Sequence, residues 1–410
     1  MAPGKFNEAV FPELRSAWKS YLETLDELRQ RFDESEQFRL APDQIGMAYR
    51  QLMEVQALAY NFAIGPRHAH PRMFRNTTWN TEFYAIGGNG PDFDYRVTFL
   101  DGRHTYRLSG TWNDCRFMIA QANFRMPGSE GSRCLANYDL STFSQDDDGR
   151  FVIVVSATPH EGNWIALEPD EPYQWLMFRP TLESWDAIPP KMEIRRTSEL
   201  AKHETELAEY SQEVVARRIR QAASLLRYFI GEWPLTFAPL TLEKAGGFNR
   251  YYELSTSEGG EVGSPAAQYL QFVFDVAEDE ALILELEEQP DAPYWSFQLF
   301  DIWQHSLAMR TAQTSLHMSQ ISIDSDGKCR LVLCGTDPGY WNWLDSGSYR
   351  RGEVLWRTYN ATRNVGHSIM RVKRADLGSI LPADTRRCSP KERARELARR
   401  EAAYILRYGE

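Results

Sequence analysis

Three polar or aromatic side chains alternate along the apolar stretch YWSFQLFDIWQHSL, which begins at Tyr294. If this stretch is a β-strand, Asp301, Trp303 and His305 lie on one face, because successive side chains of a strand point to opposite sides. A histidine oriented by a carboxylate can act as a general base, and Arg310, which follows, could clamp an anion. The pattern predicts a catalytic rim or pocket. The alternative is a solvated sheet face with ion pairs between aspartate and arginine.

A second stretch, GTDPGYWNWLDSGSYRRGEVLWR, runs from Gly335 to Arg357 and supplies more candidates. Tyr349 and Arg351 are expected to complete the catalytic group. Aromatic residues make up 13% of the chain, and large rings either fill β-sandwich cores or form a stacking surface for a ring-shaped ligand. Under the stacking hypothesis, the ligand-binding residues are Trp295, Trp303, Trp341, Asn342 and Asp345.

The common signatures of cofactor and metal sites are missing from the sequence. It has no P-loop, no Gly-x-Ser-x-Gly elbow, no His-Glu-x-x-His motif and no Cys-rich metal pattern. His68 and His70 form a His-x-His pair in a segment rich in Gly and Pro, but no downstream Glu and His complete a metal set. We therefore predict an activity without cofactor or metal, and a surface turn at the two histidines.

The chain contains a duplicated pattern. Asp148-Gly149 and Asp326-Gly327 lie 178 residues apart, Asn163-Trp164 and Asn342-Trp343 lie 179 apart, and Arg179 and Arg357 lie 178 apart. Asp-Gly between two β-rich runs is a strong hairpin signal. A period this long indicates two similar domains rather than a solenoid. Because Arg179 and Arg357 recur, we interpret them as structural residues that clamp the turn after Asn-Trp.

Composition excludes several classes of function. A formal net charge of −11 argues against binding a phosphate backbone, and no apolar run is long enough to span a membrane. The N-terminal residues lack the apolar core of a signal peptide. The five cysteines form no Cys-x-x-Cys pair, which favours reduced thiols and a cytoplasmic protein.

The predicted fold is mainly β with flanking helices, in the α+β class, and consists of two tandem, duplicated antiparallel β-sandwich domains. Residues 1–64 form an N-terminal helical region with a break at Ala41-Pro42. Within its first helix the apolar stripe expected to face inward consists of Phe11, Leu14, Trp18, Leu22, Leu25 and Leu28. The other expected units are a first β domain at 65–196, a linker helix at 197–234 that stops at Pro234, a second β domain at 235–377 and a C-terminal helical tail at 378–410.

Several of these motifs together resemble a known family. YWSFQLFDIWQHSL, TSLHMSQISIDSDGKCRLVL from Thr314 and TDPGYWNWLDSGSYRRG from Thr336 are similar to the bacterial family of domain of unknown function 1214, which is related to the 1254 family. GGNGPDFDY from Gly87 and GNWIALEPD resemble the family's N-terminal pattern. The resemblance implies paired, jelly-roll-like β-sandwich domains and a bacterial source. Its members often accompany the catabolism of aromatic, terpenoid or steroid-like compounds.

The chain departs from the family pattern at two places. Ser348-Tyr349 stands where the family commonly has Gly-His, and Gly90-Pro91-Asp92-Phe93 stands where it often has Asn-Pro-Asp-Asn. If the family's histidine and asparagine are catalytic, these departures imply a lost or changed activity.

Three functional hypotheses remain open from the sequence. The first is a cofactor-independent lyase, isomerase or hydrolase that acts on a ring-bearing small molecule in a catabolic pathway. The second is a non-catalytic protein that binds a glycan or an aromatic ligand. The third is an assembly protein, a homo-oligomer built through its terminal helices. None of the three involves nucleic acid or a membrane.

Overall fold

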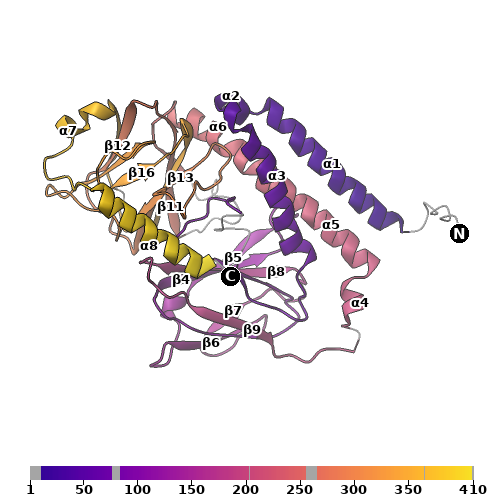
Figure 1. Ribbon diagram of the computed structural model, residues 1–410. Coiled ribbons are helices and arrows are strands. Elements are labelled where there is room, and N and C mark those ends of the chain that lie inside the picture. The colour runs from indigo at the N-terminus through magenta and orange to yellow at the C-terminus, as the bar shows by residue number, and fades with distance from the viewer. Residues whose placement is uncertain (1–10, 76–83, 203, 255–265, 364, 409–410) are drawn as a thin grey trace.

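Two β domains of the same design form most of the molecule (Figure 1). The computed structural model describes residues 11–75, 84–202, 204–254, 266–363 and 365–408. The first domain has sheets ordered β1-β2-β8-β4-β5 and β7-β6-β3-β9, and the second has β10-β11-β17-β13-β14 and β16-β15-β12-β18. Each strand of the second domain therefore occupies the place of the strand nine numbers earlier, and the predicted duplication is confirmed.

The strand boundaries follow the apolar runs between the turns. The first domain contains β1 (Phe74–Arg75), β2 (Arg96–Leu100), β3 (Tyr106–Thr111), β4 (Cys115–Phe124), β5 (Arg133–Asp139), β6 (Arg150–Ser156), β7 (Trp164–Ala166), β8 (Gln174–Leu182) and β9 (Lys191–Arg196). The second contains β10 (Tyr252–Leu254), β11 (Ala267–Asp275), β12 (Glu280–Leu286), β13 (Tyr294–Phe300), β14 (Ser315–His317), β15 (Cys329–Cys334), β16 (Trp343–Asp345), β17 (Arg351–Tyr359) and β18 (His367–Lys373).

One strand pair in each domain corrects the prediction of purely antiparallel sheets. β7 runs parallel to β6, and β16 runs parallel to β15, over three residue pairs each. A parallel neighbour requires the chain to return to the start of the preceding strand before it pairs again. The loops between these strands make that return, and Asn163 and Asn342 stand at their ends.

The helices precede, separate and follow the two domains. They are α1 (Pro12–Glu34), α2 (Glu36–Leu40), α3 (Ile45–Ala59), α4 (Glu206–Glu209), α5 (Gln212–Leu226), α6 (Pro234–Ala245), α7 (Leu377–Ile380) and α8 (Pro390–Tyr408). Single π-helical turns, η2 (Tyr60–Ile64) and η4 (Arg227–Glu232), extend α3 and α5, and short 3₁₀ turns are η1 (Pro42–Gln44), η3 (Leu140–Thr142) and η5 (Arg374–Asp376). None of the helices in the described ranges has the length and apolar character needed to cross a membrane.

Each sandwich has its own core, and a third core joins the domains to the helices. Because side chains alternate along a strand, each five-stranded sheet turns one face into its sandwich and the other outward. The outward faces contribute Phe99, Trp175 and Val273 to a cluster that also contains Phe62 of η2 and Phe229 of η4. Figure 1 shows α1, α3 and α5 gathered beside the two domains. The helices therefore cover sheet surface that would otherwise be apolar and exposed.

The buried side of α1 differs from the predicted stripe. Ala17, Thr24, Leu28 and Phe32 are buried, while Trp18 is 52% exposed. Phe11 and Leu22 are exposed as well. Small residues face α5 because the two helices run close together along much of their length. These exposed apolar side chains are available for contact with a partner chain. The predicted homo-oligomer stays a prediction.

The linker region is also more broken than predicted. In place of one helix ending before Pro234, α4 and α5 are separate, and Pro234 begins α6 instead of stopping a helix. Proline suits this first helical position because its missing N–H would have no partner there. Helix α6 then continues to Ala245, inside the segment assigned to the second β domain.

Helix α8 docks through arginines rather than through an apolar stripe. Arg393, Arg400 and Arg407 recur every seven residues, and each is no more than 5% exposed. Arg400 donates to the carbonyl oxygens of Ala312 and Ser315, at 3.1 and 2.6 Å. Arg407 donates to the carbonyl oxygens of Pro91 and Ser184 in the first domain. The helix therefore ties the second domain to the first (Figure 1).

Candidate functional site

The predicted catalytic face is a turn in the structure, not a strand. Strand β13 ends at Phe300, and Gln304 adopts a left-handed backbone conformation with φ of 65°. The Asp301 carboxylate closes this turn, because it accepts the backbone N–H groups of Trp303 and His305 at 2.8 and 2.9 Å. Strand alternation therefore does not apply beyond Phe300, and the predicted common face of Asp301, Trp303 and His305 is wrong.

His305 lies between two carboxylates inside the protein. Its Nδ1 is 3.1 Å from Asp301 Oδ2, and its Nε2 is 3.6 Å from Glu54 Oε2 on α3. Asp301 and His305 have no exposed surface, and Glu54 is 4% exposed. Glu54 also pairs with Arg50 at 2.6 Å. Neither Asp301 nor His305 lines the main pockets of the described residues. The cluster connects α3 to the second domain, and neither of these two side chains reaches the surface.

The tryptophans chosen as stacking platforms are packed inside the protein. Trp295 and Trp303 are no more than 1% exposed. Trp341 is half-buried, its indole N–H donates to the carbonyl of Gln320, and the guanidinium of Arg386 lies 3.5 Å from its ring centroid. These rings fill cores and brace loops, so the alternative that aromatic side chains serve packing describes them better.

Asn342 has a structural partner set that recurs in the first domain. Its side-chain amide donates to the carbonyl oxygens of Ser322 and Arg330 at 2.7 and 2.9 Å and accepts the N–H of Ser322 at 2.8 Å. Asn163 makes the same three bonds with Ser144 and Val152. A role kept in both copies indicates that this asparagine holds the loop before the parallel strand, rather than a ligand.

Replacing Asn342 with alanine is expected to lower the free energy of unfolding by about 2 kcal/mol, because buried backbone groups lose their partners. Ligand binding by the folded variant should not change. The matched variant Asn163→Ala should cost less, since its site is more exposed. Chemical denaturation followed by fluorescence measures both. An equal cost at the two sites would contradict this explanation.

The remaining predicted residues are scattered. Arg310 pairs with Glu401 of α8 at 3.4 Å, and Arg351 pairs with Asp275 at 3.2 Å and donates to the carbonyl of Leu40 at 2.6 Å. Asp345 caps the N–H of Gly347, and Tyr349 lies in a shallow surface hollow. The structure does not bring Arg310, Arg351 or Tyr349 together with His305 into one reaction site.

The two histidines near the start of the first domain are not arranged around a metal. Burial lowers the pKa of His68 to about 3, and His70 is exposed. Within the described ranges no group of three or more His, Cys, Asp or Glu side chains could hold a metal ion.

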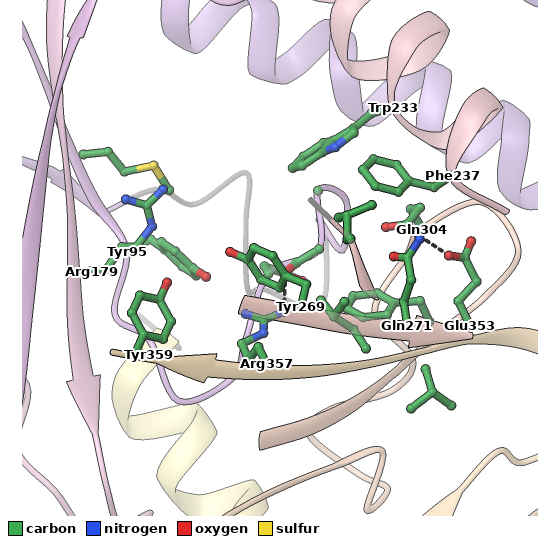
Figure 2. Close-up of a pocket in the computed structure, with 18 residues that line it drawn as sticks. Tyr95, Arg179, Trp233, Phe237, Tyr269, Gln271, Gln304, Glu353, Arg357 and Tyr359 are labelled. Carbon is green, nitrogen blue, oxygen red and sulfur yellow. Dashed lines mark hydrogen bonds between the residues drawn. The ribbon is translucent and has the colours of Figure 1, made fainter. Parts of the chain in front are cut away.

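A pocket that the sequence interpretation missed lies between the two domains (Figure 2). Its cavity volume is about 70 Å³, and its walls come from both five-stranded sheets, from the loop at Gly87–Asn89 and from the α6 region. Its polar lining includes Arg179, Arg357, Tyr95, Tyr269, Tyr359, Gln271, Gln304 and Glu353, and its large apolar members include Trp233, Phe237 and Phe300. Pockets of this kind, apolar with a few convergent polar groups, are typical ligand sites.

Two of these polar pairs are copies of each other. Tyr269 lies opposite Arg357 in the β11–β17 ladder. In the first domain Arg96 lies opposite Phe178 and Phe93 opposite Thr181, which places Tyr95 opposite Arg179. Each domain therefore contributes one tyrosine–arginine pair from the same position of its sheet. Both arginines are 3% exposed. The interpretation that they clamp the turn after Asn-Trp is wrong.

The surroundings of Arg357 favour an added negative charge. Burial acts to lower the pKa of its guanidinium, but the phenol groups of Tyr95 and Tyr269 act in the opposite direction, and the pKa is raised. The guanidinium donates to the carbonyl oxygen of Gly88 at 2.7 Å, and its Nε has no hydrogen-bond partner within the described residues. No carboxylate of these residues lies within ion-pair distance of it. An anionic ligand could supply that partner.

The opposite end of the pocket has different chemistry. Glu353 and Gln304 lie there beside Trp233 and Phe237, away from Arg179 and Tyr95 (Figure 2). The side-chain amide of Gln304 donates to Glu353. Glu353 pairs with Val273 in its ladder, and the corresponding position of the first domain is Trp175, opposite Phe99. The duplication is therefore conserved at the arginine end and broken at the carboxyl end.

Comparison with known proteins relates both β domains to a family. A family model described as "Protein of unknown function (DUF1214)" matches residues 92–180 and 276–363. Each β domain therefore contains one segment that matches the DUF1214 model. A crystal structure of an uncharacterised protein from Burkholderia cenocepacia has 24% sequence identity and a TM-score of 0.79, and the match covers 90% of this chain and all of that one. The VPA0106 protein from Vibrio parahaemolyticus is 12% identical, with a TM-score of 0.47 and coverage of 80% and 98%. No curated protein matches the chain.

The match confirms the resemblance to the 1214 family and its duplication. Arg179 and Arg357 lie inside the matched segments, whereas Trp233, Phe237 and Tyr269 of the same pocket lie outside them. The Burkholderia structure supports the fold alone. It assigns no activity to DUF1214 domains.

Proposed function

We propose that this protein binds a ring-bearing organic anion in the pocket between its two β domains. The observation that supports this most is the convergence of two tyrosine–arginine pairs, Tyr95 with Arg179 and Tyr269 with Arg357, on one pocket. Guanidinium groups bind carboxylates and phosphates through paired hydrogen bonds, and phenol hydroxyls add further donors. Trp233 and Phe237 provide the apolar wall that a ring would contact.

The expected result is that charge and shape both contribute to binding. 4-Benzylbenzoate should bind more tightly than its neutral amide, by about tenfold or more. Arg357→Met and Arg179→Met should each remove most of this preference, whereas Arg195→Met, at an exposed site, should leave it unchanged. Titration calorimetry measures the affinities. Equal binding of acid and amide would contradict the proposal.

An enzyme is the second candidate, and one observation favours it over a purely binding role. A buried carboxyl group, Glu353, lines the pocket without an ionic partner among the described residues, which is typical of a proton-transfer residue. The enzymatic hypothesis of a cofactor-independent lyase, isomerase or hydrolase thus moves from His305 to this pocket. Mass spectrometry of each bound acid after incubation separates the two functions, since only an enzyme changes its ligand.

A further inference from the structure

Glu353 is a buried carboxyl group with an uncommitted oxygen. The residue is 2% exposed, and its Oε2 accepts a hydrogen bond from Gln304. Its Oε1 has no partner within the described residues. Burial raises the pKa of this carboxyl well above its usual range, and the negative charge of Asp301 acts in the same direction. These surroundings favour the protonated form of the carboxyl group, which has an O–H to donate.

The position of Glu353 relative to Arg357 sets the length of a ligand that contacts both residues. The two residues are four apart on β17, on the same face, so their Cα atoms are about 13 Å apart. Figure 2 shows Arg357 near the middle of the pocket, with Arg179 toward one end and Glu353 at the other. A ligand that contacts both arginines and Glu353 needs a spacer between its two polar ends, and a ring against Trp233 and Phe237 provides one.

We propose that the pocket selects ring-bearing acids that carry a neutral oxygen acceptor at the end away from the anionic group, and that Glu353 donates a hydrogen bond to this oxygen. The inference rests on the proposed function, in which Arg179 and Arg357 hold the anion. A carbonyl oxygen is a strong and common neutral acceptor, so the substrate class is oxo-substituted aromatic or alicyclic acids. A second charge at that end would be disfavoured, because Asp301 lies nearby.

Two compounds that differ in one group test this. 4-Benzoylbenzoate has a ketone where 4-benzylbenzoate has a methylene, and both carry the same carboxylate. The wild-type protein should bind the ketone about tenfold more tightly, the effect of one buried hydrogen bond that would otherwise be unmade. Glu353→Leu should bind both compounds equally, and Glu353→Gln, which keeps a donor, should retain part of the preference.

Raising the pH provides a second readout. The charge of Asp301 acts on Glu353, and Tyr269 and Arg357 line the same pocket; the helical wall contributes Trp233 and Phe237, which carry no charge. As the pH rises and Glu353 ionises, the wild type should lose its ketone preference. The preference of Glu353→Gln should persist as the pH rises.

Stability gives a measurement that needs no ligand. Unfolded glutamate ionises near pH ~4.3, while the folded group keeps its proton to higher pH. Folding therefore takes up a proton in between, and wild-type stability should fall as the pH rises through this window. Glu353→Gln does not take up this proton, so its free energy of unfolding should rise with pH relative to that of the wild type. A constant difference would contradict a protonated Glu353.

The outcomes separate this inference from the function on which it rests. Binding of neither compound would overturn the proposed anion site itself. Equal binding of the two by the wild-type protein, or an unchanged ketone preference in Glu353→Leu, would overturn the role of Glu353 and leave the arginine site standing. If Glu353→Leu does not fold, the pH dependence of wild type and Glu353→Gln decides the question.

Discussion

Replacing Arg400 with methionine is expected to destabilise the protein by about 3 kcal/mol, a loss that chemical denaturation would detect directly. The guanidinium lies in the interior and satisfies the carbonyl oxygens of Ala312 and Ser315. Burial lowers its pKa to about 10, so it remains charged at neutral pH. Methionine fills similar volume but offers no donors, and the buried carbonyl groups lose their partners. Relief of the desolvated charge offsets part of this cost.

An exposed arginine on the same helix provides the control. Arg395→Met, on the outer face of α8, should change stability by less than about 0.5 kcal/mol. Arg400→Met should also loosen α8 as a whole, which limited proteolysis near the C-terminus would show. Equal stability of the two variants would mean that α8 is held by its few apolar contacts instead.

Replacing His305 with alanine is expected to cost about 3 kcal/mol or more, with no direct loss of ligand binding. Alanine leaves the Asp301 and Glu54 carboxylates facing each other across a buried gap, without the imidazole that separates them. Two effects add here: a cavity forms, and a buried carboxylate loses its donor. Thermal unfolding and the benzylbenzoate titration together measure the two parts of the prediction.

The control for this variant is His160→Ala, because His160 is exposed and lies outside the core of either domain. It should leave unfolding and binding unchanged. If His305→Ala folds normally yet no longer binds or converts the ligand, the original hypothesis of a catalytic histidine would be restored.

Local signals were sufficient to predict the fold. Asp-Gly turns at Asp148 and Asp326 separate β-rich runs at nearly constant spacing, and glycine takes the positive φ that these turns require. The breaks between helices were harder, because Pro234 can end one helix or begin the next, and only packing decides. The inward side of α1 was misjudged for a related reason. Small residues such as Ala17 face α5, while Trp18 remains outside.

The candidate site could not be predicted to the same extent. Alternation suggested a strand through His305, but the Asp301 carboxylate folds the chain back after Phe300. The partner of His305, Glu54, comes from a helix about 250 residues earlier in the sequence, and no local pattern connects them. Arg179 and Arg357 were visible as a repeat, yet their matching tyrosines were not. Tyr95 and Tyr269 are separated by a different spacing, because the loops between the strands differ in length.

The asymmetric pocket has a consequence for how binding specificity could arise in a duplicated chain. Two separate identical subunits related by a two-fold axis can offer only identical halves to a ligand on that axis. Once both copies belong to one chain, each half can mutate alone. Here the halves still share their cationic ends, while Trp175 in one copy corresponds to Glu353 in the other. Fusion thus permits a polar ligand to be held in a single orientation, which a symmetric dimer could not impose.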